Sequence, residues 1–211
     1  MSNEEDDVPQ LSASTFLALQ EFYKEREEKE KRFVSSPNEN VQLDEDWQLS
    51  QFWYDDKTIE EIVNIAVEAV GPDGKVALIS CPSLYKKLKN KMSNEGTVTL
   101  YEYDRRFAVY GEDFVHFDYK LALSVPRDKA NYYDLVIADP PFLSEECLTK
   151  TAVTIKFLTK FRVMLCTGAV MQQLVERLLD LKQTSFKPQH KNNLANEFSC
   201  YTNFSFQHEI Q

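Results

Sequence analysis

The residues best suited to chemistry form one short stretch, in which an apolar run ends at an acid followed by two prolines. The run over 134–138 is rich in β-branched residues and has the length of a buried strand, and Asp139, Pro140, Pro141 and Phe142 follow it. Because Pro140 forces its predecessor into an extended conformation and neither proline donates an N–H, backbone carbonyls at this turn lack ladder partners. A carboxylate, carbonyl acceptors and an aromatic ring together suit the orientation of an amine.

The stretch from Asp139 to Phe142 resembles the motif of amino methyltransferases, which use S-adenosylmethionine to methylate exocyclic amines of nucleobases or amines of proteins. In an open α/β sheet this position lies at the carboxyl edge, where such sheets bind ligands. The alternative is an ordinary turn at a strand end, since Asp and Pro are common turn residues. The motif alone leaves both interpretations open.

Acids also follow two other expected strands. Glu102 and Asp104 end the second strand, and Asp118 and Tyr119 follow the third. In a nucleotide-type sheet an acid after the second strand takes the ribose hydroxyls, and an adenine ring would stack near Asp118 and Tyr119. One such acid is readily a turn residue, but three strands each ending at a carboxylate favour a ligand site.

The turn after the first expected strand has an unusual composition for a nucleotide site. It reads Ser80-Cys81-Pro82-Ser83-Leu84 and lacks the glycines that let a backbone approach a pyrophosphate, which argues against NAD or FAD. S-adenosylmethionine carries no phosphate. We therefore expect Ser80 and Ser83 to hold its methionine end.

The elements that must position these residues alternate between strand and helix patterns, which indicates a mainly parallel sheet covered by helices on both faces. We expect strands over 75–80, 97–104, 114–117, 134–138 and 162–166, with a closing hairpin within 184–206. Helices are expected after the first strand, after Ser144 and over 170–181. A further helix, opened by a capping box of Thr58 and Glu61, ends at Gly71-Pro72 before the sheet begins.

An aromatic cluster precedes that helix and contains both tryptophans of the chain within eight residues. It either seals an N-terminal arm onto the core or lines the cofactor or substrate cleft. The candidate cleft residues in it are Trp47, Gln51, Phe52, Trp53 and Tyr54.

The chain divides into an N-terminal arm, 1–40, and one domain, 41–211. The arm holds an acidic leader, a charged helix over 11–33 and a linker. The 211 residues and 43% hydrophobic content fit a single globular core.

Composition also limits the cellular class and the partners. No apolar run is long enough to span a membrane and the first residues are acidic, so we expect an intracellular, cytoplasmic, soluble protein. Four widely spaced cysteines predict reduced thiols and no metal site. The net charge of −10 makes nucleic acid a poor partner and a basic protein a better one.

Four segments together are similar to one family, the eukaryotic protein-lysine methyltransferases that act on translation elongation factor 1-alpha, formerly grouped with adenine-specific DNA methyltransferases. These segments are 47–54, 102–107, 139–142 and 193–198. The resemblance implies a seven-strand Rossmann-like S-adenosylmethionine-dependent fold with an N-terminal helical arm. It also implies elongation factor 1-alpha as substrate, and Asn196 and Glu197 at the substrate cleft. We expect the protein to be a monomer.

The resemblance makes Asp139, Pro140, Pro141 and Phe142 the catalytic motif, with Asp139 also bordering the cofactor. A lysine amine has an ordinary pKa of about 10.4 and must lose a proton before it attacks. Desolvation favours that loss, whereas a nearby carboxylate opposes it. We therefore expect Asp139 and the Pro140 carbonyl to orient the amine, with Phe142 on the lysine stem.

Two other functions fit the same residues. An adenine methyltransferase would use the motif on a flat exocyclic amine, but flipping a base calls for groove-binding cations that the sequence does not show. A non-catalytic binding module on the same fold would explain the turn without glycines.

Overall fold

A computed structural model describes residues 51–192 and 196–206, together with Asp46 and positions 17, 20, 21 and 24. Two compact units divide the chain, Met1–Val41 and Gln42–Gln211, and the four described positions of the first unit are helical. Most of the predicted helix over 11–33, Trp47 and residues 193–195 lie outside the described residues. The predicted boundary after residue 40 stays a prediction.

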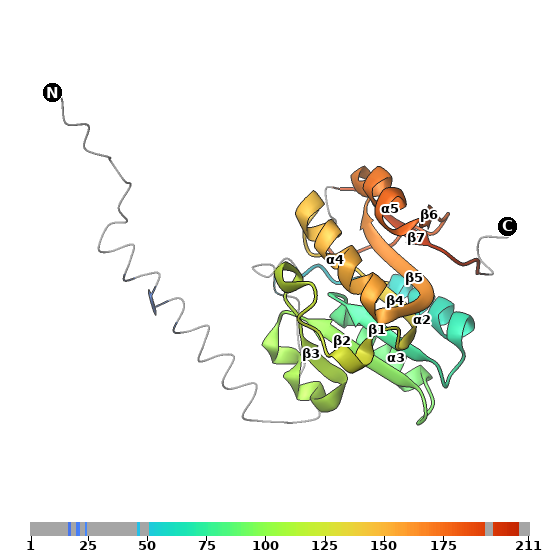
Figure 1. The fold of residues 1–211 in the computed structure, drawn as a ribbon, viewed down its shortest axis with the longest axis horizontal. Coiled ribbons are helices and arrows are strands. Elements are labelled where there is room, and N and C mark those ends of the chain that lie inside the picture. Colours follow the sequence, from blue (N-terminus) through green and yellow to red (C-terminus); the bar gives the residue numbers. More distant parts are fainter. Residues whose placement is uncertain are drawn as a thin grey trace. The chain divides into compact units, whose positions relative to one another are not determined.

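The second unit is built on a seven-stranded sheet in the order β3-β2-β1-β4-β5-β7-β6 (Figure 1). The first five strands are parallel, and β7 runs antiparallel to both β5 and β6. The strands are β1 (Lys75–Ile79), β2 (Thr97–Glu102), β3 (Phe114–His116), β4 (Tyr133–Ala138), β5 (Thr159–Gly168), β6 (Lys182–Gln183) and β7 (Phe198–Thr202). All five predicted parallel strands are confirmed, and β5 extends beyond its predicted span at both ends.

The helices are α2 (Asp56–Val70), α3 (Tyr85–Lys91), α4 (Glu145–Leu158) and α5 (Gln172–Leu179). Short 3-10 turns connect the elements: η2 (Pro82–Leu84), η3 (Arg105–Asp113), η4 (Tyr119–Leu121), η5 (Arg127–Lys129) and η6 (Ala169–Met171). Helices α2 and α3 contact each other, as do α4 and α5. The two pairs cover opposite faces of the sheet (Figure 1).

The core follows from the near-continuous apolar runs of the central strands. Val136 and Ala138 of β4 belong to the cluster shared with α4 and α5. Because successive side chains of a strand point to opposite faces, Leu135 and Ile137 are buried on the other side. Burial on both faces is typical of parallel sheets, and it places the end of β4 at the centre of the carboxyl edge.

Capping and terminating residues predict three helix ends from the sequence; the structure corrects one of them and confirms the other two. Asp55, not Thr58, is the N-cap of α2: its side chain accepts a 2.7 Å hydrogen bond from the Thr58 N–H. The predicted end at Gly71 is confirmed, with φ of 74°. Ser144 caps α4 as predicted, accepting from the Cys147 N–H at 3.2 Å.

A closing antiparallel pair of strands is present, but only β7 lies within the predicted span; β6, its partner, ends just before Thr184. None of the described helices is long and apolar enough to cross a membrane. The four cysteines are buried and form no disulfide. In the described part of the chain no group of three His, Cys, Asp or Glu side chains is placed to hold a metal ion.

Candidate active site

Asp139 follows the last residue of β4, so the strand ends where the two prolines predict. Its N–H donates a 3.0 Å hydrogen bond to the Ile79 carbonyl, which fixes the backbone of the acid against the end of β1. Pro140 is buried and Phe142 is 44% exposed. The motif therefore presents its acid at the end of the central strands and its aromatic ring to solvent.

The side chain of Asp139 accepts a 2.6 Å hydrogen bond at Oδ2 from the hydroxyl of Tyr54. Desolvation raises the pKa of Asp139 to about 7; the Tyr54 hydrogen bond opposes the rise and the carboxylate of Glu102 adds to it. Tyr54 is one of the aromatic residues predicted to plug or line the cleft, but its contact with Asp139 was not predicted. A buried tyrosine needs a partner for its hydroxyl, which is the one signal that pointed to such a bond.

The aromatic segment is held by a part of the chain far away in sequence. Tyr54 forms an isolated antiparallel bridge with His190, and their ring centroids are 5.0 Å apart. The Lys191 N–H donates to the Trp53 carbonyl at 2.9 Å, and the Asp55 N–H donates to the Gln189 carbonyl at 3.0 Å. The segment thus packs onto the domain and also reaches the site, so the two predicted roles are compatible.

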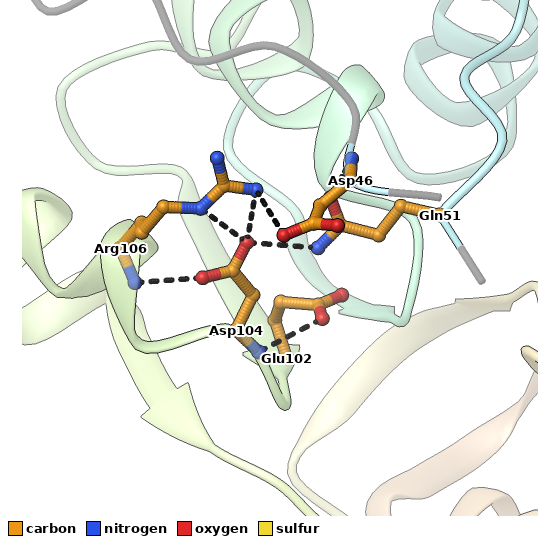
Figure 2. A network of polar contacts seen from close by, with 5 residues as sticks. All are labelled: Asp46, Gln51, Glu102, Asp104 and Arg106. Atoms are coloured by element: carbon orange, nitrogen blue, oxygen red, sulfur yellow. Dashed lines mark hydrogen bonds and ion pairs between the residues drawn. The ribbon is translucent and has the colours of Figure 1, made fainter. Parts of the chain in front are cut away.

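A network of polar side chains joins the aromatic segment to the end of β2 (Figure 2). Asp104 Oδ2 accepts from Gln51 Nε2 at 3.0 Å and from Arg106 Nε at 2.8 Å, and it lies 2.6 Å from Arg106 Nη2. Its Oδ1 accepts from the Arg106 N–H at 2.9 Å. Arg106 Nη2 also lies 3.9 Å from Asp46 Oδ2. Both oxygens of Asp104 are thus engaged within the protein.

Glu102 lies beside this network but, unlike Asp104, has no cationic partner among the described residues. Its side chain is 4% exposed and its Oε1 accepts from the Asp104 N–H at 3.1 Å. Among the described residues it forms no ion pair. Desolvation raises the pKa of Glu102 to about 7, and the Asp104 charge adds to the rise while hydrogen bonds oppose it.

The turn after β1 contains a residue, Ser80, with an uncommon backbone conformation. Ser80 takes a left-handed φ of 56°, which is uncommon for a serine, while its N–H donates to the Tyr101 carbonyl at 2.9 Å. Ser83 lies in the 3-10 turn that follows and is partly exposed. The turn joins the end of β1 next to β4, which brings both serines to the same edge as Asp139.

Of the two predicted cofactor residues after β3, Tyr119 contacts the motif and Asp118 caps the turn that begins at Tyr119. Asp118 accepts from the Lys120 N–H at 2.9 Å and caps a short turn. The ring of Tyr119 meets that of Phe142 edge to face, with centroids 5.8 Å apart. The ends of β1, β2, β3 and β4 therefore lie along one edge of the sheet, and a common cofactor site there stays a prediction.

The predicted cleft residues Asn196 and Glu197 lie just before β7, next to the carboxyl end of β5. Asn196 and Glu197 are exposed, and Glu197 uses its carbonyl on the Ala169 N–H at 2.8 Å and its carboxylate on Lys187 at 2.5 Å. No interaction of theirs with Asp139 is found in residues 51–192 or 196–206. Their role in the cleft, like that of Phe52 and Trp53, stays a prediction.

The strand order, the antiparallel β7 and the acidic carboxyl edge with Asp139 at its centre define the Rossmann-like fold of S-adenosylmethionine-dependent methyltransferases. Magnesium protoporphyrin IX methyltransferase from Synechocystis PCC 6803, solved with the cofactor bound, shares this fold. Its TM-score is 0.50 at 11% identity, covering 92% of this chain and 99% of that chain. The predicted fold class is confirmed.

Sequence comparisons place the chain more narrowly. Residues 45–206 match the family described as "Probable N6-adenine methyltransferase". EEF1A lysine methyltransferase 1 of Gallus gallus is 47% identical over 209 residues, covering 97% of this chain and 98% of the relative. The Mus musculus protein of that name is 48% identical over 204 residues, covering 96% and 95%. The chain belongs to the EEF1A lysine methyltransferase 1 family, which confirms the predicted resemblance.

Proposed function

We propose that this protein transfers a methyl group from S-adenosylmethionine to a lysine amine of translation elongation factor 1-alpha. The observation that carries the proposal is the position of Asp139, partly buried at the end of β4 and within electrostatic reach of Glu102. Neither acid forms an ion pair with a described residue, and two such acids suit a positively charged ligand. The names of the relatives supply the substrate, and the predicted cytoplasmic location belongs to the same proposal.

The residues at the strand ends fit the cofactor. Glu102 is buried at the end of β2 and forms no ion pair within the described chain. We assign its carboxylate, which also accepts hydrogen bonds from the Asp104 N–H and from Gln51, to the ribose hydroxyls. Asp104 is engaged by Arg106 and Gln51, and we assign it the supporting role of holding the end of β2. Asp118 and Tyr119 border the adenine, and Ser80 and Ser83 border the methionine end. When bound, the cofactor supplies an electrophilic methyl group on a sulfonium.

The motif residues act on the amine. The side chain of Asp139 and the Pro140 carbonyl accept its N–H groups and so aim its lone pair. The fixed turn contributes by placing these acceptors in advance, as expected when positioning supplies most of the rate. The exposed ring of Phe142 and the partly buried ring of Tyr119 offer an aromatic pair for the lysine stem, or for the ammonium before it loses its proton.

The charge of the chain favours a protein substrate. A net charge of −10 repels polyanions and attracts basic surfaces, whereas enzymes that flip a base need cations along the nucleic acid. The family description still names adenine, which keeps N6-adenine methylation as the second candidate.

The test is transfer of a labelled methyl group by the purified full-length chain. We expect label on purified elongation factor 1-alpha, located by mass spectrometry on a lysine, and none with the Asp139→Ala variant. A cytosolic lysate treated with or without nuclease forms the second arm. Nuclease-sensitive label would establish the adenine activity, and cofactor binding without label on either substrate would leave a binding module.

A further inference from the structure

The Asp139 carboxylate is held by one side chain from outside the sheet. Tyr54 donates to Oδ2 at 2.6 Å, a length typical of a strong hydroxyl–carboxylate bond. In residues 51–192 and 196–206 no hydrogen bond to Oδ1 is found. The two oxygens of this acid are therefore inequivalent before any substrate arrives.

Tyr54 is itself fixed in place. It is 1% exposed, and its ring packs on His190, which in turn meets Phe198 of β7 with centroids 4.7 Å apart. Backbone hydrogen bonds from the segment 189–191 hold the residues on either side of it. Three residues earlier, Gln51 is tied to Asp104. The hydroxyl is thus presented to Asp139 by a segment pinned at both ends.

We propose that Tyr54 is a positioning residue of methyl transfer, whose hydroxyl fixes the Asp139 carboxylate and leaves Oδ1 to receive the substrate amine. This role rests on the proposed function and deepens it. It makes the aromatic segment part of the catalytic apparatus through a single contact with the motif acid. A carboxylate held by one oxygen loses its freedom to rotate, so the amine meets an acceptor that is already aimed.

The contact has a consequence for protonation. A hydrogen bond donated to the ionised form stabilises that form and lowers the pKa, against the desolvation that raises it. The titratable groups that interact with Asp139 are Tyr54, Cys81 after β1, Glu102 of β2 and Cys166 of β5. Burial raises the pKa of the Cys81 thiol and of the Tyr54 phenol, and a hydrogen bond with Cys200, together with burial, raises the pKa of the Cys166 thiol. These groups therefore stay neutral at physiological pH. Glu102 titrates in the same range but is present in wild type and variant alike.

The test is the pH dependence of methylation by Tyr54→Phe. Two groups must each lose a proton, Asp139 and the substrate lysine, so log kcat/KM rises with a slope of two below the lower pKa and one above it. Removing the hydroxyl should raise the lower pKa of this profile, that of Asp139, by about one pH unit; this pKa is the lower break in the plot. It should also reduce kcat at pH 7 about tenfold. The affinity for S-adenosylmethionine, measured by calorimetry, should stay within a few-fold.

Tyr85→Phe is the matched control. Tyr85 of α3 is also buried and also donates to an aspartate, Asp113 Oδ2, at 2.7 Å, and it is not among the groups that shift the pKa of Asp139. It should leave the lower break unchanged. If Tyr54→Phe folds poorly, 3-fluorotyrosine at position 54 keeps the ring and a stronger O–H donor, and it should move the break to lower pH.

An unshifted break in a folded Tyr54→Phe variant that still methylates would overturn the positioning role. So would a loss of activity in the double variant Tyr54→Phe/Asp139→Asn well beyond that of Asp139→Asn alone, because a residue acting through Asp139 adds nothing once the carboxylate is gone. Wild type that binds the cofactor but does not label elongation factor 1-alpha would contradict the proposed function instead.

Discussion

Asp139 at the end of β4 and Glu102 at the end of β2 are two acids from neighbouring parts of the carboxyl edge that interact electrostatically. Desolvation raises the pKa of each to about 7, and the negative charge of Glu102 adds to the shift at Asp139. Nothing in the local sequence of either strand contains this relationship. It arises because only β1 separates β2 from β4 in the sheet, so the carboxyl ends of β2 and β4 lie one strand apart.

Asp139→Ala should separate catalysis from cofactor binding. Loss of the acceptor that orients the amine is expected to lower turnover by a factor of roughly a hundred or more, because the interaction serves the transition state. Binding of S-adenosylmethionine, followed by calorimetry, should change by only a few-fold. Equal losses of binding and activity would instead assign this carboxylate to the cofactor.

Glu102→Gln and Asp104→Asn should have different effects although the residues are two positions apart. Glu102→Gln removes a charged acceptor for the ribose and should weaken cofactor affinity about tenfold. Asp104→Asn breaks a buried ion pair with Arg106 and should cost roughly 3 kcal/mol in the free energy of unfolding. Chemical denaturation and calorimetry on both variants check this, and a reversed pattern would exchange the two assigned roles.

The cofactor-free protein should lose stability as the pH rises from about 4 to about 7. Glu102 and Asp139 have folded-state pKa values raised to about 7, above their ordinary values. Between the two limits the native state binds more protons than the unfolded chain, so the free energy of unfolding falls with increasing pH. Thermal melts of wild type and Glu102→Gln across this window provide the measurement. The Glu102→Gln variant has no charge to bury at this position, so its stability relative to wild type should increase as the pH rises. A stability difference that does not change with pH would contradict the raised pKa of Glu102.

Phe142→Ala should affect the protein substrate and little else. The ring is 44% exposed and meets Tyr119, so its loss should leave the melting temperature nearly unchanged. We expect kcat/KM for elongation factor 1-alpha to fall about tenfold, the size of a strong contact between a ring and a lysine. Phe161→Ala is the matched control. Phe161 is 55% exposed and lies near the amino end of β5, whereas the candidate site lies at the carboxyl ends of the strands. Equal effects of the two variants would remove Phe142 from the substrate site.

Much of the fold followed from local patterns. The apolar run before Asp139 predicts β4 because its length and β-branched residues suit only a buried strand, and Ser144 predicts the start of α4 because its hydroxyl can cap a free N–H. The acids at strand ends were predicted to meet because parallel strands share one carboxyl edge. The N-cap of α2 was wrong because Thr58 and Asp55 both offer oxygen acceptors, and in the structure the Thr58 hydroxyl accepts from the Gln189 N–H.

The sequence by itself determined which residues stand at the strand ends, because that depends on periodicity and on the two prolines that stop β4. Only the tertiary structure decided which acids are free for ligands. Glu102 and Asp104 look alike in sequence, but Arg106 forms an ion pair with Asp104 and none with Glu102 among the described residues. It likewise decided that the Tyr54 hydroxyl donates to Asp139, 85 positions away. Such contacts depend on the packing of the segments 51–55 and 189–191 against each other, and no short-range pattern encodes a pairing over that separation.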